Sequence, residues 1–280
     1  MDTNQYEPGL SFNQYRNIGR DSELLTVNAS ILKQPTALEM WSAMQPDEEG
    51  ESTLALSRGD ALHKAVLEPK AFNEEFDDFY LMSPTKGINT KAAQEARLLN
   101  PDKILYNDDI LVDVEGMQKA IERHALAMDM LNNCDHKELS GVAYDKEFNI
   151  VRKIRVDAAP GIGNDRGNYL VDIKSCQSIR FFDFRRSILK FGYHLAAAYY
   201  IDTDAMITGQ PPRENFYFIG VQSVKPFMAR VYALLPEDIE KGRELYKERL
   251  GILTQAVSDN QYCAYEHESD PIPIPLTFGE

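Results

Sequence analysis

The chain has 280 residues, of which 43% are hydrophobic and 26% are charged, a composition typical of a soluble globular protein with a substantial core. No apolar run approaches the roughly 18 residues that a membrane-spanning helix needs. The polar N-terminus also lacks the basic and then apolar order of a secretory signal. We therefore expect a cytoplasmic protein that contacts no membrane.

The cysteines exclude several kinds of site. The chain has three of them, Cys134, Cys176 and Cys263, which lie far apart in the sequence. No pair has the spacing of metal ligands, so the pattern argues against a zinc or iron–sulfur site, and an odd, scattered set does not imply disulfides.

The charge of the chain is unevenly distributed. A net charge of −14 argues against nucleic-acid binding by bulk attraction. Residues 151–190, however, hold nine Lys or Arg against four Asp, a net charge of +5, which leaves −19 for the rest of the chain. This distribution is typical of an enzyme that admits DNA at one place only. The alternative is a solvated face on which basic residues cluster by chance.

The N-terminal part divides into a loose segment and the start of a domain. Residues 1–25 are polar and are expected to form a flexible N-terminal segment, and residues 26–280 a single domain. The segment 27–44 predicts two short helices, the first capped by Asn28 and separated from the second at Pro35.

Helical periodicity dominates the next hundred residues. Apolar residues at helical spacing predict a helix over 54–68, which ends before a proline. A short strand is expected around 76–81 and a helix over 90–99. The segment 110–134 predicts one longer helix, because its apolar residues recur at three and four residues.

The period then changes to that of strands. Three runs, 138–145, 149–160 and 168–175, predict an antiparallel meander. The glycines in the loop at 161–163 indicate a hairpin turn, since no strand, third glycine and helix surround them as a phosphate-binding loop requires.

The C-terminal half completes the predicted sheet. Residues 179–205 are expected to be helical with a joint at Gly192, and 216–221 with 228–235 to form a second hairpin. A helix is expected over 236–257. This order of elements predicts an α/β fold with a mixed central β-sheet flanked by helices.

Two of the predicted strands carry residues suited to metal-dependent hydrolysis. Asp172 and Lys174 are two residues apart on one strand, so they project from the same face. Asp157, on the preceding strand, can lie beside Asp172 if the hairpin pairs them in register. The two carboxylates and the backbone carbonyl of Ile173 are oxygen ligands of the kind that Mg²⁺ takes.

This set of groups matches the needs of phosphodiester hydrolysis. A bound metal activates water and neutralises developing charge, and Lys174 would polarise the attacking water and stabilise the transition state. The alternative is structural, because an Asp-x-Lys triplet at a strand edge is commonly a surface salt bridge.

Four segments carry a family resemblance, namely GDALHKAVLEP (59–69), RVDA (155–158), VDIKS (171–175) and FGYHLAAAYY (191–200). In this order and spacing they resemble the PD-(D/E)XK nuclease superfamily, and more narrowly the nuclease domain of RecE-type exonucleases (exodeoxyribonuclease VIII). The resemblance spans roughly residues 25–270. It implies a PD-(D/E)XK core for the domain.

The resemblance implies roles for five residues of the expected site. His63 would be a ligand or close neighbour of one metal ion, and Asp157 and Asp172 would be the metal carboxylates. Lys174 would be the catalytic lysine. Glu138 matches an acidic position that assists the metal or the water.

The resemblance also departs from the family pattern at one position. Where the family usually has a glutamine after its Tyr-His pair, this chain has Ala196, four residues before Tyr200. An alanine side chain makes no hydrogen bond, so a contact to substrate or site is missing. His194 and Gln177 are the candidates to replace it.

The basic segment after the Asp-x-Lys triplet supplies the expected DNA contacts. These candidate DNA-binding residues are Arg180, Arg185, Arg186, Lys190, Tyr193 and His194. If the cations contact phosphates, binding should weaken steeply with salt.

The resemblance implies a Mg²⁺-dependent exonuclease, for which Mn²⁺ can substitute, that degrades linear double-stranded DNA from its ends, usually 5′ to 3′. Such enzymes form homo-oligomeric rings in bacterial or phage-infected cells and leave single strands for a partner annealing protein in recombination. Two alternatives remain open: another PD-(D/E)XK nuclease, either RecB-like or an endonuclease, and a catalytically degenerate module that binds DNA or protein.

Overall fold

The structure is a computed structural model, and it describes residues 4–7, 9–10, 12–19, 22–45, 54–74, 76–100, 103–161 and 167–265. The strands are β1 (Gln5–Glu7), β2 (Thr26–Val27), β3 (Tyr80–Met82), β4 (Ile104–Tyr106), β5 (His136–Asp145), β6 (Ile150–Ala159), β7 (Tyr169–Cys176), β8 (Asn215–Gln222) and β9 (Ala229–Ala233). The helices are α1 (Phe12–Asn17), α2 (Ala29–Leu32), α3 (Ala37–Met44), α4 (Leu54–Leu67), α5 (Pro69–Glu74), α6 (Phe76–Phe79), α7 (Lys91–Leu99), α8 (Asp108–Glu122), α9 (Ala125–Asn132), α10 (Phe181–Lys190), α11 (Tyr193–Thr208) and α12 (Pro236–Asp259).

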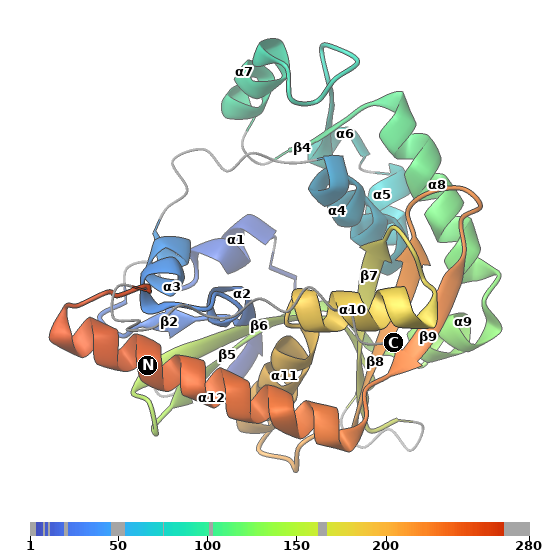
Figure 1. The fold of residues 1–280 in the computed structure, drawn as a ribbon. Coiled ribbons are helices and arrows are strands. Elements are labelled where there is room, and N and C mark those ends of the chain that lie inside the picture. Colours follow the sequence, from blue (N-terminus) through green and yellow to red (C-terminus); the bar gives the residue numbers. More distant parts are fainter. Residues whose placement is uncertain are drawn as a thin grey trace, which may run out of the picture.

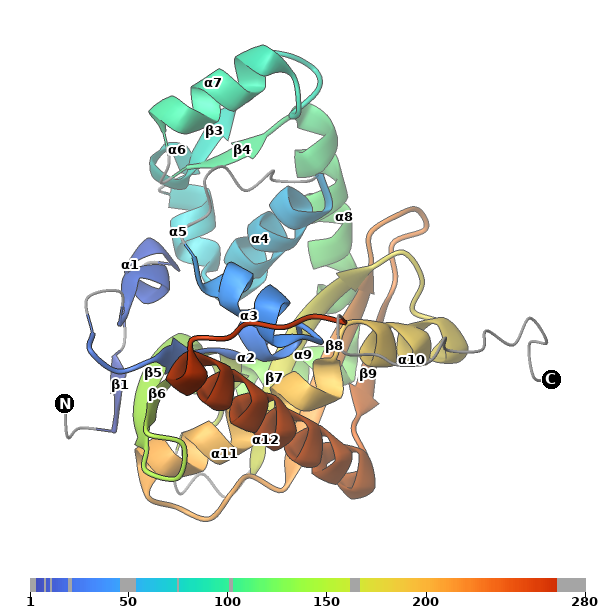
Figure 2. The same cartoon turned by 60° about the vertical axis from the view of Figure 1, so that its left-hand side comes forward.

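One mixed sheet organises the molecule (Figure 1). Its order is β1-β5-β6-β7-β8-β9, with β2 paired to β6. The strands β5, β6 and β7 form the expected antiparallel meander, and β7 runs parallel to β8. The predicted α/β fold with a mixed sheet flanked by helices is confirmed. A small parallel pair, β3 and β4, lies apart from this sheet beside α7 (Figures 1 and 2).

The edge of β6 that faces away from β5 is shared by two strands. At the start of β6, β2 pairs with residues 151–152, and near its end β7 pairs at Ala158. Between these two points, the described residues form no ladder along this edge. The opening leaves main-chain groups at the facing edges of β6 and β7 available to other partners, and Asp157 lies beside it.

Alternation along the strands divides the core into two layers. Leu170 of β7 packs into the cluster formed with α2, α11 and α12. Its neighbours Val171 and Ile173 pack into the cluster formed with α4, α8 and α9. Figure 1 shows α11 and α12 on one side of the sheet and α8 and α9 on the other. The sheet is therefore covered on both faces.

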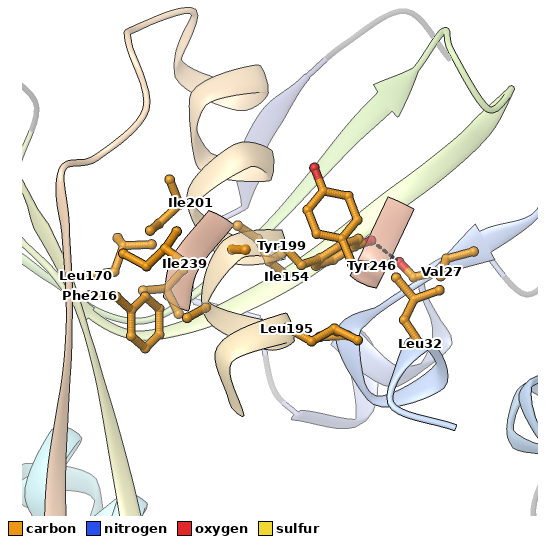
Figure 3. Close-up of a cluster of buried hydrophobic side chains, with 14 of the residues drawn as sticks. Val27, Leu32, Ile154, Leu170, Leu195, Tyr199, Ile201, Phe216, Ile239 and Tyr246 are labelled. Carbon is orange, nitrogen blue, oxygen red and sulfur yellow. Dashed lines mark hydrogen bonds between the residues drawn. The ribbon is translucent and has the colours of Figure 1, made fainter. Parts of the chain in front are cut away.

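Aliphatic and aromatic side chains pack between the sheet and the helices α11 and α12 (Figure 3). Tyr199 and Tyr246 are fully buried and meet edge to face, with ring centroids 5.5 Å apart. The Tyr199 hydroxyl donates a hydrogen bond of 2.8 Å to the carbonyl oxygen of Val27, so its polar end is satisfied. This bond ties α11 to β2, and α2 follows β2 directly.

Two predicted elements differ in the structure. The helix expected over 110–134 is divided, because α8 ends at Glu122 and α9 begins at Ala125. His124 caps the second helix through Nδ1, which accepts a hydrogen bond of 3.3 Å from Ala127 N. The strand expected over 76–81 begins instead as α6 and becomes extended only at Tyr80.

The first 25 residues include parts that pack on the domain. Gln5–Glu7 pair with β5 as β1, and Tyr15 of α1 is buried. These described parts of the segment expected to be flexible are thus attached to the sheet and its surroundings. The turn expected at 161–163 falls mainly on residues outside the described ones. Among the described helices, none combines the length and the apolar character needed to span a bilayer.

Gly242 and Gly251 on α12 offer a matched test of this packing. A Cβ at Gly242 would lie 2.1 Å from the carbonyl oxygen of His194 on α11, whereas a Cβ at Gly251 would meet no atom within 4 Å. We expect Gly242→Ala to lower the free energy of unfolding by about 1–3 kcal/mol. Gly251→Ala should raise it by up to about 1 kcal/mol through helix propensity. Urea unfolding measures both, and similar effects at the two positions would contradict this packing.

Candidate active site

Three adjacent strands bring carboxylates to the same level of the sheet. The pairs Lys137–Ala158 and Leu139–Val156 put Glu138 of β5 opposite Asp157 of β6. The pair Ala158–Val171 puts Asp157 opposite Asp172 of β7, because antiparallel partners have a constant sum of residue numbers. The register on which the predicted pairing of Asp157 and Asp172 depended is therefore present.

Glu138 adopts an unusual backbone conformation. Its φ is 50°, in the left-handed region that non-glycine residues seldom adopt. The side chain forms an ion pair with Arg155 of β6. The Arg155 guanidinium also donates hydrogen bonds of 2.9 Å to Ser140 Oγ and to the carbonyl of Leu10. Arg155 thus fixes the position of the Glu138 carboxylate.

His63 reaches the sheet from α4 and contacts all three strands. Its Nε2 lies 2.9 Å from the carbonyl oxygen of Ile173 on β7. Its Nδ1 lies 3.6 Å from Asp157 Oδ2 and 3.7 Å from Glu138 Oε1. The imidazole therefore sits between the two carboxylates and the β7 backbone.

Asp157 also bridges the opening between β6 and β7. Its Oδ2 accepts a hydrogen bond of 2.7 Å from the amide of Ile173. The Ile173 amide thus bonds to Asp157 and its carbonyl to His63. Both Asp157 and Asp172 are buried, with 7% and 6% of their surface exposed.

Lys174 completes the group. Its ammonium lies 2.6 Å from Asp172 Oδ2 and 5.4 Å from the ring centroid of Tyr193 on α11. Asp172 Oδ2 is buried, yet it accepts no hydrogen bond of good geometry from a described residue. Asp172 Oδ2 therefore lies close to one cation and can still accept a second positively charged ligand.

The charged side chains of this cluster change one another's pKa values. Burial would lower the pKa of His63, but the carboxylates of Asp157 and Glu138 outweigh it and raise that pKa to about 9. Burial raises the pKa of Asp157 to about 7 against the attraction of His63 and Lys174, and Asp172 adds to the rise. Without a metal, the neighbouring carboxylates therefore favour the protonated form of His63 at neutral pH.

Glu138 and Lys174 stay charged at neutral pH. Burial opposes ionisation of Glu138, but hydrogen bonds and charges from His63 and Arg155 lower its pKa. Burial likewise opposes the charge on Lys174, but Asp172 and Asp157 raise its pKa. Lys174 is therefore suited to electrostatic work and not to accepting a proton.

The residues present fit a hard divalent cation. One nitrogen of His63 and one oxygen each of Glu138 and Asp157 lie within 4.8 Å of one another. Asp172 Oδ2, which pairs with Lys174, and the Ile173 carbonyl are further oxygens that could bind a metal nearby. Several oxygens with one imidazole suit Mg²⁺ or Mn²⁺. For His63 to become a ligand, it must first lose its proton.

The expected DNA-binding residues divide into two groups. The four cations expected to contact phosphates are all exposed on or next to α10, namely Arg180, Arg185, Arg186 and Lys190. Tyr193 faces the site through its contact with Lys174. His194 is not brought to the site: burial lowers its pKa, the Ile188 backbone hydrogen-bonds to it, and its own backbone packs against Gly242 of α12.

The structure shows the surroundings of Ala196, which stands where the family has a glutamine, and of Gln177 and Tyr200. Ala196 packs against the core beneath α11 and α12. Gln177 is exposed at the end of β7. Tyr200 is close enough to Asp172 and Asp157 to feel their charge, and burial raises its pKa far above the ordinary value.

Lys33 is a site neighbour that sequence reasoning missed. It ends α2, and its ammonium lies 5.3 Å from the ring centroid of Tyr193, the same ring that Lys174 contacts. Burial and then the charge of Lys174 lower the pKa of Lys33 to about 8, while Asp172 opposes the shift. No spacing rule links Lys33 to the Asp-x-Lys triplet, because α2 meets α11 only through tertiary packing.

A central mixed sheet, an opening between two strands and a cluster of carboxylates with a lysine define a domain of the PD-(D/E)XK nuclease class. A family model described as "PDDEXK-like domain of unknown function (DUF3799)" matches residues 30–267. The chain therefore belongs to this family.

One solved structure resembles the fold along nearly its whole length. It is a crystal structure of a "Putative exonuclease" from Eubacterium rectale, with a TM-score of 0.63, 14% identity and 96% of each chain covered. At this identity the likeness shows the fold alone. A search of curated proteins gives no match to this chain. The comparisons identify the PD-(D/E)XK superfamily, and they do not show that the chain belongs to the narrower group of RecE-type exonucleases.

The titration of His63 predicts how stability depends on pH in the metal-free protein. Its pKa rises from 6.5 in the unfolded chain to about 9 in the fold, so the folded state binds this proton more tightly. The contribution of His63 to the free energy of unfolding is fully present below about pH 6.5 and is lost as the pH rises through about 9.

Urea unfolding of the wild type and His63→Gln in EDTA measures this contribution. The difference in stability between the two proteins should shrink between about pH 6 and pH 9.5. His136→Gln, at an exposed position on β5, is the control and should show no such change. A difference that stays constant over this range would contradict the proposed charge state of His63.

Proposed function

We propose that the chain is a Mg²⁺-dependent deoxyribonuclease that degrades linear double-stranded DNA from an end, in the 5′ to 3′ direction. Its product would be single strands that an annealing protein uses in recombination. The convergence of two aspartates, a lysine and a histidine around Ile173 of β7 carries the proposal. The family and the fold support a nuclease; the end preference and direction rest on the resemblance to RecE-type exonucleases.

Each residue of the cluster has a distinct part in the proposed reaction. Asp157, Asp172 and the Ile173 carbonyl would hold the cation, with His63 as a further ligand and Glu138 beside it. The bound ion would supply Lewis acidity and lower the pKa of a water molecule. Lys174 remains cationic and would stabilise the negative charge that develops on the phosphate. The ring of Tyr193 supports the Lys174 ammonium in this position.

Linear and covalently closed circular duplexes of the same sequence test the proposal. With Mg²⁺, the linear duplex should be shortened from its ends while the circle stays intact, and Mn²⁺ should replace Mg²⁺. Labels on the 5′ and 3′ ends report the direction. Equal cutting of the circle would indicate an endonuclease of the same superfamily.

Absence of any digestion would favour the degenerate binding module, to which Ala196 and the charge of −14 point. The retained cluster supports catalysis over this alternative, because a module that only binds has no need of it. We also propose that the active form is a homo-oligomeric ring around DNA, which analytical ultracentrifugation of the intact chain would test.

A further inference from the structure

The outer face of α10 carries large apolar side chains that the fold does not use. Phe181, Phe182 and Leu189 are 52%, 68% and 62% exposed, and Phe191 just after the helix is 47% exposed. The inner face is anchored by Phe184, which is buried and stacks on Tyr232 at 4.5 Å. The outward rings are therefore not needed to hold α10 in place. Figure 2 shows α10 at the outside of the molecule.

Cations alternate with these apolar groups. At helical spacing, Phe181 and Arg185 lie one turn apart, and so do Phe182 and Arg186. The acidic Asp183 on this helix already has a partner, because its carboxylate accepts a hydrogen bond of 2.7 Å from the Ser178 hydroxyl. The exposed face is thus both aromatic and positively charged, in a chain whose net charge is −14.

Aromatic contacts connect this face with the proposed active site. Phe191 stacks with Tyr193 at 5.7 Å and an interplanar angle of 28°. The Lys190 ammonium lies over Phe191 at 5.2 Å, and the Lys174 ammonium over Tyr193 at 5.4 Å. A ligand at the C-terminal end of α10 can therefore continue toward Lys174 along rings and ammonium groups.

We propose that the outer face of α10 binds single-stranded DNA next to the active site, with bases stacked on Phe181 and Phe182 and phosphates on the neighbouring arginines. The identity of the ligand as DNA rests on the proposed function. Aromatic faces interleaved with cations are what single-stranded nucleic acid needs, because every base offers a ring face and every phosphate a charge. A purely apolar partner would make no use of the positive charges of Arg185 and Arg186.

The angle between two neighbouring rings on α10 suits nucleic-acid bases better than it suits a flat apolar partner. Phe181 and Phe182 are in contact at 5.2 Å, with an interplanar angle of 76°. Their faces point in different directions, so each can stack on a separate base. Phe191 and Tyr193 lead from the C-terminal end of α10 to Lys174, so a strand that continues past Lys190 would approach the carboxylates.

Fluorescence anisotropy in EDTA tests the proposal without cleavage. The probes are a labelled oligo-dT and an abasic oligonucleotide of equal length, which has the same charge and no bases. The wild type should prefer oligo-dT. Phe181→Ala/Phe182→Ala should weaken oligo-dT binding by about tenfold or more and leave abasic binding nearly unchanged. Arg185→Ala/Arg186→Ala should weaken both and reduce the salt dependence.

The matched control is Leu98→Ala/Leu99→Ala, an adjacent exposed apolar pair on α7 that should change neither affinity. Equal binding of both probes by the wild type would overturn the proposal even if linear DNA is digested. Preferred oligo-dT binding without digestion would support it while the proposed function failed. Wild-type binding to anionic vesicles that depends on the two phenylalanines, with no preference for oligo-dT, would also overturn it.

Discussion

Asp172→Asn is expected to reduce hydrolysis of linear DNA by about 1000-fold or more, because it removes a metal carboxylate and the anion that pairs with Lys174. Asparagine has nearly the same shape, so the fold should persist. The affinity for Mn²⁺, measured by calorimetry, should fall together with the activity. This joint loss would identify Asp172 as a group that acts through the cation.

Asp259→Asn is the matched control for this substitution. Asp259 is exposed at the end of α12, where it accepts a hydrogen bond from Gln255. The same chemical change there should leave Mn²⁺ affinity and activity at wild-type levels. Full activity in Asp172→Asn would show that the hydrolytic site lies elsewhere, and circular dichroism would exclude unfolding as the cause of a loss.

Lys174→Met is expected to lower the rate by about 100-fold to 1000-fold while Mn²⁺ still binds. Methionine keeps much of the length of the side chain and its contact with Tyr193, but it cannot stabilise developing negative charge. Since Lys174 competes with a metal for Asp172, affinity for Mn²⁺ should stay equal or increase. The two variants together separate holding the cation from stabilising the transition state.

Lys119→Met provides the control for loss of a lysine. Lys119 lies on the surface of α8, where it pairs with Glu115. Its replacement should change the rate by less than twofold, as is usual for exposed charges. If Lys174→Met lost metal binding as completely as Asp172→Asn, the assigned division of roles would be wrong.

Much of the sheet could be predicted because its determinants are local. Alternation in β5, β6 and β7 and the turn residues between them specify a meander, and its register follows once the strands pair. The facing of Asp157 and Asp172 is thus a consequence of short-range pattern. His63 lies over 90 residues upstream, and its place came from the family resemblance, not from periodicity.

Other features depend on how helices pack and could not be predicted in this way. Lys33 and Tyr200 approach the carboxylates because α2 and α11 pack together on one face of the sheet. The helix α11 is apolar on most of its surface, so its sequence does not say which side faces the site. Tyr193 consequently faces Lys174, while His194, expected to contact DNA, lies against α12.

The division between α8 and α9 has a similar cause. The apolar spacing continues across 110–134, so periodicity alone predicts one helix. The break depends on the cap that His124 provides to Ala127, a local bond that competes with helix continuation. Polar residues that act as caps within an apolar pattern are therefore where this kind of prediction is weakest.

The position of a bound metal tests the central claim most directly. Crystals grown with Mn²⁺ and measured at the manganese absorption edge should show an anomalous peak bounded by His63, Asp157, Asp172 and the Ile173 carbonyl, with Lys174 adjacent. The peak should be absent in crystals of Asp172→Asn. A fully loaded crystal with its only manganese peaks at other places, or an unchanged peak in Asp172→Asn, would contradict the assignment of this cluster as the catalytic metal site.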